Sequence, residues 1–258
     1  MNRLIPIAFA ILLSACQNVP LTGRSQIQLI SPGQEAAMGL SAYESILKKE
    51  KISTDPANNE LVARVGGRIA AATGRTDFKW EFKVIEDDKQ INAFCLPGGK
   101  VAVYTGLFPV SRDEAGLAAV IGHEVAHAIA RHGGERLSQE IIVAGATVAA
   151  AASTKDPKKR DLYAGLLGAG AAVGFLLPYS RLHESEADRM GLIYMAKAGY
   201  DPRAAADLWR RMAEAGKGKS KPPEILSTHP ADQTRIHQIE QWLPEALKYY
   251  QPRPRPMP

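Results

Sequence analysis

The chain has 258 residues, a length that suits one full hydrophobic core or two smaller ones. Lys and Arg outnumber Asp and Glu by 32 to 27, and these charges are spread along the chain. Because proteins that bind nucleic acid gather their basic residues on one face or in one stretch, this charge pattern indicates no nucleic-acid partner.

The first residues of the chain indicate a secretion signal. They read "MNRLIPIAFAILLSA", with a basic start, an apolar run too short to span a bilayer, and small residues directly before Cys16. The ending "LSAC" is typical of bacterial lipoproteins, so we expect residues 1–15 to be removed and Cys16 to carry a lipid anchor. Gln17, where Asp would favour the inner membrane, favours the outer membrane. An ordinary signal with an incidental cysteine is the alternative.

Helices are expected to begin shortly after this point. We expect residues 16–30 to form an extended linker from the anchor, followed by a helix with Ser31 as its cap. Pro32 suits the first helical position, and Gln34 can complete a capping box with Ser31. A capping residue followed by proline occurs again at Asp55 and Pro56, and it predicts a second helix over residues 55–74.

The middle of the chain changes to the alternating pattern of β-strands. Trp80, Phe82 and Val84 alternate with charged residues, which predicts a half-buried strand. A second strand is expected over residues 101–106, after the turn "LPGG". Nearly everything after residue 112 has helical composition, so the predicted fold class is α+β, mostly α, with a small sheet.

Two apolar runs interrupt the helical part, at residues 141–153 and 162–178, with the charged stretch "TKDPKKRD" between them. Each is shorter than the roughly 20 residues that cross a bilayer. We interpret them as a helical hairpin buried against the body, and the alternative is a hairpin that dips into the membrane or covers a site. Residues 31–250 are expected to form a single domain, and the Pro-rich tail at residues 251–258 to be a frayed end.

The stretch "VIGHEVAHAIARHGG" holds the first candidate site. His123 and His127 lie on the same face of a helix, within about 6 Å of each other, and can bind one zinc ion. Glu124 lies about 100° round the helix, where it can accept a proton from a polarised water. If the three side chains were merely buried in this apolar helix, each would need hydrogen-bond partners.

A tetrahedral zinc site needs a third protein ligand. The stretch "RLHESEADRMGLIYMAKAGY" reads as a second helix, on which Glu184 and Asp188 share a face. We expect Glu184 to bind the metal and Asp188 to accept the free ring N–H of His123, which would fix that ring. His183 reads as an ordinary surface histidine.

Several ordered segments together resemble a known family. They are "NAFCLPGGKVAVYTGL", "IGHEVAHAIARH", "LLPYSRLHESEADRMGL" and "LSTHPADQTRI". They are similar to the zinc metallopeptidases of the HtpX, BepA and LoiP types and the CAAX prenyl endopeptidases, most of all to small bacterial lipoprotein members. The resemblance implies a gluzincin-like domain whose sheet has an edge strand along the active site. It also implies one zinc per chain, bound by His123, His127 and Glu184, with Glu124 as general base.

The resemblance implies further roles that spacing alone does not indicate. His229 of "THP" would lie near the metal and either steady the oxyanion or occupy the water position in a latent state. Asp188 would belong to the catalytic set, Tyr179 is a second candidate oxyanion donor, and Arg235 would brace the site, with a surface arginine as the alternative. The segment "NAFCLPGGKVAVYTG" resembles the edge strand along the active site of the family, and it would bind an extended substrate by main-chain pairing. Its candidate residues are Asn92, Gly98, Gly99, Lys100, Val101, Ala102 and Val103.

These features predict a membrane-anchored zinc endopeptidase that cleaves misfolded or misassembled cell-envelope proteins. We expect it on the outer membrane facing the periplasm, with outer-membrane assembly machinery or other envelope proteases as possible partners and no nucleic acid. One alternative is a lipoprotein chaperone or assembly factor on the same zinc fold with weak or latent protease activity. Another is a membrane-inserting structural protein built on the two apolar runs.

Overall fold

The computed structural model describes residues 16–154, 156, 158, 180–217, 223–230 and 233–252. The expected signal peptide, the second apolar run, Tyr179 and most of the Pro-rich tail lie outside the described residues. The chain divides into two compact units: Met1–Gln34 with Arg131–Leu177, and Glu35–Ala130 with Pro178–Pro258. We call them the first and the second unit. The segment expected as one domain is therefore divided, because residues 131–177 group with the N-terminal segment.

The first unit joins a β-hairpin to a long helix. Strand β1 (Cys16–Asn18) pairs antiparallel with β2 (Ser25–Ile27), and β2 packs against α6 (His132–Ser153). The guanidinium group of Arg24 donates two hydrogen bonds to the carboxylate of Glu135 in the first turn of α6, at 2.9 and 2.6 Å. The stretch expected to be an extended linker is thus a hairpin that is held to this helix.

The first apolar run forms the second half of α6, and its large side chains are exposed. The exposed fraction is 42% for Ile141, 64% for Val143 and 53% for Val148. The expectation that this run is buried against the body is therefore wrong for the described residues. Among the residues that the structure describes, no helix has the length and apolar composition needed to cross a membrane.

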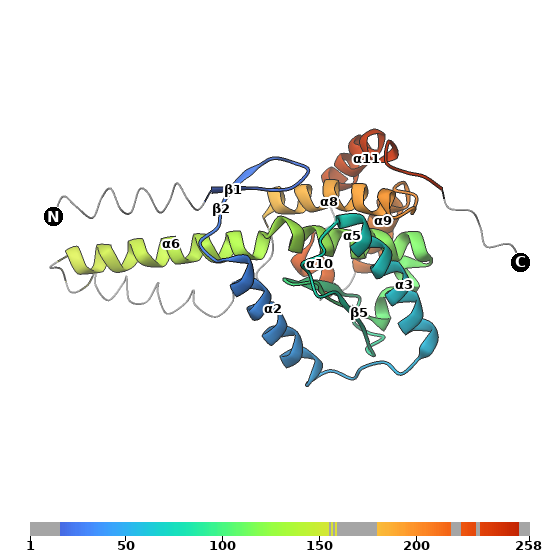
Figure 1. Ribbon diagram of the computed structural model, residues 1–258, viewed down its shortest axis with the longest axis horizontal. Coiled ribbons are helices and arrows are strands. Elements are labelled where there is room, and N and C mark those ends of the chain that lie inside the picture. Colours follow the sequence, from blue (N-terminus) through green and yellow to red (C-terminus); the bar gives the residue numbers. More distant parts are fainter. Residues whose placement is uncertain are drawn as a thin grey trace, which may run out of the picture. The chain divides into compact units, whose positions relative to one another are not determined.

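Helices dominate the second unit (Figure 1). They are α2 (Pro32–Leu47, whose first turn belongs to the first unit), α3 (Pro56–Thr73), α4 (Phe108–Ser111), α5 (Glu114–Ala130), α8 (Arg181–Lys197), α9 (Ala204–Gly216), α10 (Glu224–Thr228) and α11 (Gln233–Leu247), with a 3-10 turn at Thr105–Leu107. The predicted mostly helical fold with a small sheet is confirmed.

Local sequence determines where the first two helices begin. The N–H of Gln34 donates to Oγ of Ser31 at 3.2 Å, and the N–H of Ser31 donates back to Oε1 of Gln34 at 3.0 Å. This is the predicted capping box. At α3, the carboxylate of Asp55 accepts the N–H of Ala57 at 2.9 Å, and Gly74 ends the helix with φ of 70°.

The sheet of the second unit has three strands, in the order β3 (Glu81–Ile85), β5 (Lys100–Tyr104), β4 (Ala93–Leu96). Strand β5 is central: it pairs parallel with β3 and antiparallel with β4. Strand β4 packs against α5, and Tyr43 of α2 packs on Ala102 in a buried cluster. The sheet thus lies between α5 and α2, with β4 at one edge.

Helices α5 and α8 touch through their backbones at two glycines. A Cβ atom on Gly191 would lie 3.0 Å from the backbone nitrogen of His123, and one on Gly122 would lie 3.1 Å from the carbonyl oxygen of Gly191. All side chains of α5 from Gly116 to Ala130 are buried, which explains the apolar composition of this helix. The close crossing brings the histidine face of α5 against the first turns of α8.

Candidate metal centre

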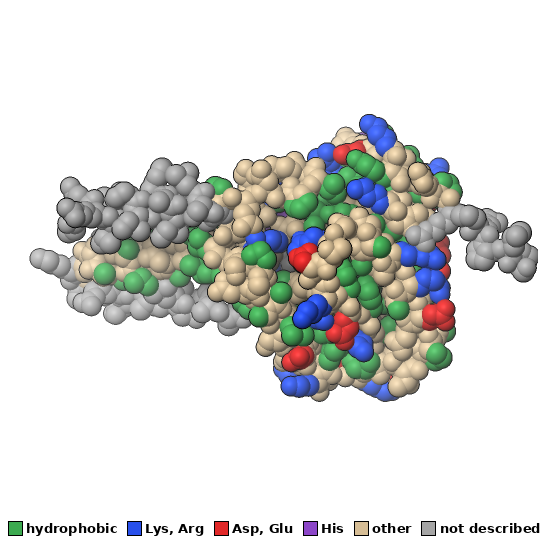
Figure 2. All heavy atoms as spheres, viewed as in Figure 1, with side chains coloured by type: hydrophobic (Ala, Val, Ile, Leu, Met, Phe, Trp, Pro, Cys, Tyr) green, Lys and Arg blue, Asp and Glu red, His purple; other side chains and the backbone are tan. Residues whose placement is uncertain are grey.

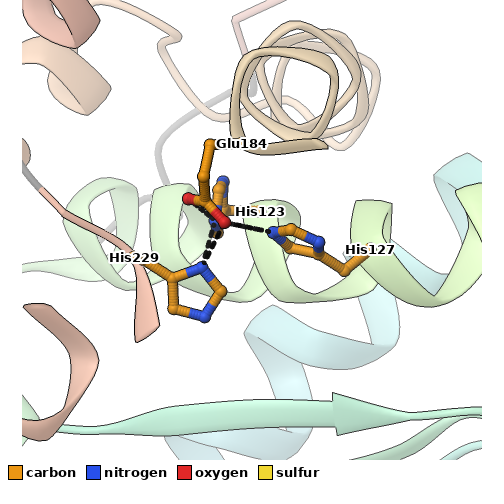
Figure 3. Close-up of side chains that lie close together, drawn as sticks. All are labelled: His123, His127, Glu184 and His229. Carbon is orange, nitrogen blue, oxygen red and sulfur yellow. Dashed lines mark hydrogen bonds and ion pairs between the residues drawn. The ribbon is translucent and has the colours of Figure 1, made fainter. Parts of the chain in front are cut away.

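Four buried side chains from three helices converge on one point (Figure 3). His123 and His127 extend from α5, and Glu184 extends from the first turn of α8. His229 is the residue that ends α10, and its backbone N–H donates to the carbonyl of Ile225 at 2.7 Å. One ligand atom from each of the four lies within 4.8 Å of the others.

The distances between these atoms fit a tetrahedral zinc site. Nε2 of His123 lies 3.1 Å from Nε2 of His127 and 3.2 Å from Nδ1 of His229. Oε1 of Glu184 lies 2.9 Å from Nδ1 of His229 and 3.3 Å from Nε2 of His127. Zinc bonds of about 2.0–2.1 Å in tetrahedral geometry place neighbouring ligand atoms about 3.3–3.4 Å apart. Three nitrogens and one carboxylate oxygen are also a donor set that suits zinc.

The structure thus brings together the three predicted ligands, His123, His127 and Glu184. It also places Nδ1 of His229 within the same group, so the donor set holds four protein atoms. Of the two roles that the resemblance implied for His229, the observed position corresponds to occupation of the water position. His183, expected at the surface, is 5% exposed and is therefore buried.

Asp188 lies one turn after Glu184 and orients a ligand histidine. Its Oδ1 atom lies 2.9 Å from Nδ1 of His123, so the other ring nitrogen faces the centre. Arg235 holds this carboxylate in turn: Nε donates to Oδ2 at 2.7 Å and Nη2 to Oδ1 at 2.8 Å. Nη1 of Arg235 lies 3.1 Å from Oε2 of Glu184, so one guanidinium group contacts two carboxylates of the site.

Trp209 on α9 completes the support of this arginine. The guanidinium carbon of Arg235 lies 3.4 Å above the centre of the indole ring, and the ring of His123 meets the indole edge-to-face at 5.4 Å. Sequence reasoning did not identify Trp209, because it belongs to no motif. Its only signal was an aromatic residue at the apolar spacing of a helix, which is typical of any core position.

Glu124 is buried beside the four ligand atoms. It is 4% exposed, its Oε1 atom has no hydrogen-bond partner among the described residues, and that atom lies 3.6 Å from Nε2 of His229. Burial raises the pKa of Glu124, an effect that the charges of His229 and His123 offset only in part. A buried carboxylate oxygen without a hydrogen bond is costly, and such groups concentrate at catalytic sites.

The buried carboxylates around the four ligand atoms favour positive charge at this centre. Burial and the charge of Arg235 lower the pKa of His123, but the carboxylates of Asp188 and Glu184 outweigh them and raise it to about 9. Burial would raise the pKa of Glu184, yet the charge of His229 and the hydrogen bonds of His123 and His127 lower it far more. Carboxylates that stay ionised while buried provide the negative charge that a bound cation needs.

The predicted substrate-pairing segment is only partly suited to that role. Its residues Lys100–Val103 lie in the central strand β5, whose main chain pairs with β3 on one side and β4 on the other, so a substrate strand cannot pair with their main chain. Gly98 and Gly99 form the β4–β5 turn with φ of 85° and 87°, and their Cα positions pack against Ala36 and the Trp80 ring.

Strand β4 is one of the two edge strands of this sheet. Asn92 directly precedes this strand, and no other described strand pairs with its outer edge. The strand also packs against α5, the helix that carries Glu124. An extended substrate would therefore pair with β4 and not with β5.

Comparisons with known proteins agree with this geometry. A family profile described as "Peptidase family M48" matches residues 56–243. The chain is 41% identical over 231 residues to the mitochondrial metalloendopeptidase OMA1 of Schizosaccharomyces pombe, covering 88% of this chain and 66% of that one. It is 32% identical to OMA1 of Saccharomyces cerevisiae, covering 90% and 70%. It is 33% identical to a putative beta-barrel assembly-enhancing protease of Vibrio cholerae, covering 79% of this chain but only 43% of that protein.

Proposed function

This chain belongs to peptidase family M48 and carries the zinc metalloendopeptidase domain of that family, and from this premise we propose that it hydrolyses peptide bonds in unfolded proteins of the bacterial cell envelope. The observation that carries the proposal is the group of ligand atoms from His123, His127 and Glu184 beside the buried carboxylate of Glu124, whose Oε1 atom has no hydrogen-bond partner among the described residues. Three protein ligands with a carboxylate beside them are what metal-assisted hydrolysis requires.

The residues of the chain have separate tasks in this reaction. When bound by His123, His127 and Glu184, zinc supplies Lewis acidity that polarises the scissile carbonyl and makes water more acidic. Glu124 accepts the proton from the attacking water and delivers it to the nitrogen of the leaving amine. Asp188 keeps the ring of His123 oriented by accepting its Nδ1–H. The outer edge of β4 aligns the extended substrate by main-chain hydrogen bonds.

His229 favours the second candidate function, a protease that is latent at rest. In the arrangement described above, Nδ1 of His229 is the fourth member of the donor set. A catalytic zinc site keeps one position open for water, whereas four protein ligands are typical of closed sites. His229 must therefore leave the donor set before turnover, and in the open form it can steady the oxyanion. A chaperone or assembly factor with weak protease activity is compatible with the same arrangement.

The cellular setting is a proposal that rests on the N-terminal segment and on one group of relatives. The "LSAC" motif supports a lipid anchor on Cys16, which is exposed in the first unit. The relatives named beta-barrel assembly-enhancing proteases support misfolded or misassembled envelope proteins as substrates and the outer-membrane assembly machinery or other envelope proteases as partners. We place the protein on the outer membrane, facing the periplasm.

The test of the peptidase function is the substitution Glu124→Gln. We expect it to slow cleavage of an unfolded test protein by about 10²–10⁴-fold, because it removes the general base while the zinc ligands remain. Zinc content should stay at that of the unchanged protein. Glu44→Gln, at an exposed position of α2, is the matched control and should change neither property. Equal cleavage by the Glu124→Gln variant and the unchanged protein would exclude this mechanism.

Latency and anchoring need separate measurements. If His229 blocks the site at rest, His229→Ala should begin cleavage faster than the unchanged protein with zinc still bound. If His229 only steadies the oxyanion, the same variant should be slower, which would contradict latency. The mass of the N-terminal peptide from membrane-extracted protein reports directly whether Cys16 carries lipid.

A further inference from the structure

The second half of α6 exposes apolar side chains to a degree that its own unit does not explain. Residues 141–153 contain no charged side chain. Ile141, Ile142, Val143 and Val148 are 42%, 37%, 64% and 53% exposed. Hydrophobic side chains of this part of the helix are visible on the molecular surface at the left of Figure 2. Contiguous exposed apolar surface of this kind marks a site of interaction.

The same helix is held to the residue that we propose carries the lipid, so this inference rests in part on the proposed anchor. Cys16 begins β1, and β1 pairs with β2. The segment after β2 is fastened to the first half of α6, where Ser138 Oγ accepts the N–H of Leu29 at 2.8 Å. Arg24 adds the bidentate ion pair with Glu135 described above. Lipid on Cys16 would therefore keep this unit, and α6 with it, at the membrane surface.

The distribution of the apolar side chains favours lipid over a protein groove. Successive residues of a helix point about 100° apart, so Ile141, Ile142 and Val143 face three different sides. A groove on a protein, whether in this chain or in a second copy, covers one side of a helix, whereas the acyl chains of a bilayer can cover a wider arc of a helix that lies in its interface. The run is about 20 Å long at 1.5 Å per residue, too short for the roughly 30 Å of a hydrocarbon core.

The charged residues after the run define its orientation. The stretch "TKDPKKRD" follows the helix and holds more basic than acidic residues. Such residues exclude the end of the helix from hydrocarbon and are attracted to anionic headgroups. A helix that enters the bilayer end-on would bury them, and a helix that lies along the interface would not.

We propose that residues 141–153 of α6 lie in the interface of a bilayer that contains anionic phospholipid, parallel to its surface. Acyl chains contact Ile141, Ile142, Val143 and Val148, and the exposed Lys158 after the helix contacts the headgroups. The helix is then a second membrane contact beside the lipid on Cys16, and two contacts hold a protein much more firmly than one.

Site-specific photo-crosslinking of the full chain in bacterial membranes tests this contact. Benzoylphenylalanine is placed at Val143, or at Leu40 of α2, which is exposed to 42% and serves as the matched apolar control in the second unit. After irradiation, peptides are analysed for phosphatidylglycerol and phosphatidylethanolamine adducts. We expect several-fold more lipid adduct at position 143 than at position 40.

Each other outcome overturns the proposal. Crosslinks from position 143 to protein, to another segment of this chain or to a second copy would identify a different occupant. Equal lipid adducts at both positions would show that α6 has no special contact, and so would their absence at position 143. The mass of the N-terminal peptide and the Glu124→Gln assay are measured on the same membranes. Failure of the anchor or of the peptidase is thereby distinguished from failure of the α6 contact.

Discussion

Glu124 combines two properties that conflict in an ordinary folded protein: it is 4% exposed, and its Oε1 atom has no hydrogen-bond partner among the described residues. Burial raises its pKa above the ordinary glutamate value. Each unit of such a shift corresponds to about 1.4 kcal/mol between the two protonation states. The carboxylate of Glu124 therefore destabilises the fold when it is ionised.

Removal of this charge should stabilise the metal-free protein. The folded pKa of Glu124 lies above the unfolded one, so the folded state gains stability from the bound proton at low pH and loses it as pH rises through the folded pKa. Near pH 7, we expect the free energy of unfolding of metal-stripped Glu124→Gln to exceed that of the unchanged protein by about 1–3 kcal/mol, so the variant should unfold at a higher temperature. Near pH 4 the two proteins should unfold at a similar temperature. Calorimetry across pH measures this. A variant that is less stable near pH 7 would contradict it, and Glu44→Gln is the control.

Arg235 illustrates support of the metal centre through another residue. It makes two hydrogen bonds to Asp188 and stacks on Trp209, and both contacts need a planar guanidinium group. We expect Arg235→Lys to weaken zinc binding about 10–100-fold, measured by competition with a chromogenic chelator. Arg203→Lys, which alters an exposed pair with Asp201 of similar geometry, should leave zinc affinity unchanged. Equal affinity in both variants would show that Arg235 is not needed to position the ligands.

At the scale of elements, the crossing of α5 and α8 decides where Glu184 lies. Gly122 and Gly191 allow the two backbones to touch, so that the carboxylate from one helix meets the two imidazoles of the other. No other residue fits at this crossing without movement, since even a methyl group on Gly191 would lie 3.0 Å from a backbone nitrogen of α5. The glycines therefore serve the site although neither touches the metal position.

We expect Gly191→Ala to separate the helices by a few tenths of an ångström, and so to lower both zinc affinity and the unfolding temperature. The cost of such overpacking is typically about 1–3 kcal/mol. Gly67→Ala on α3 is the matched control, because a Cβ there meets nothing within 4 Å. That control should stabilise the protein by about 0.5–1 kcal/mol, since alanine favours the helix. If both variants raise the unfolding temperature, the close crossing is not under strain.

The helices and strands also show which structural features local sequence can predict. The caps at Ser31 and Asp55 follow from hydrogen bonds within four residues, so the starts of α2 and α3 could be predicted. Strand β5 was predicted as a strand, but its central position was not, because order in a sheet depends on partners distant in the chain. Strand β4, and not β5, therefore has an edge to which a further strand could pair.

At the scale of the whole second unit, the metal centre connects three helices that share no continuous segment. Because zinc binds the folded arrangement, it stabilises that state by about 4 kcal/mol when its free concentration is 1,000 times the dissociation constant. We expect chelation to lower the unfolding temperature and to increase hydrogen exchange in α10, which ends at His229, more than in the buried α5.

The histidines provide the matched variants for this prediction. His229→Ala should reduce the stabilisation by zinc, since it removes one of four ligand atoms. His237→Ala, at an exposed position of α11, should not. If chelation speeds exchange equally in α5 and α10, the metal does not hold α10 to the rest of the unit.

The sequence by itself determined the features that depend on helical geometry. His123, Glu124 and His127 share one helix, as do Glu184 and Asp188, and the spacing along a helix is set by covalent geometry and nearby hydrogen bonds. Such features can therefore be predicted from the sequence alone. They allowed the three ligands, the base and the residue that orients His123 to be predicted.

Only the tertiary structure decided the contacts between distant segments. It placed Nδ1 of His229 in the donor set, brought Arg235 between two carboxylates and onto Trp209, and exposed the apolar half of α6. These contacts depend on how helices pack, which in turn depends on side-chain volumes and on close approaches such as that of Gly122 and Gly191. No local period in a sequence encodes them, because the residues that meet are separated by long stretches of chain.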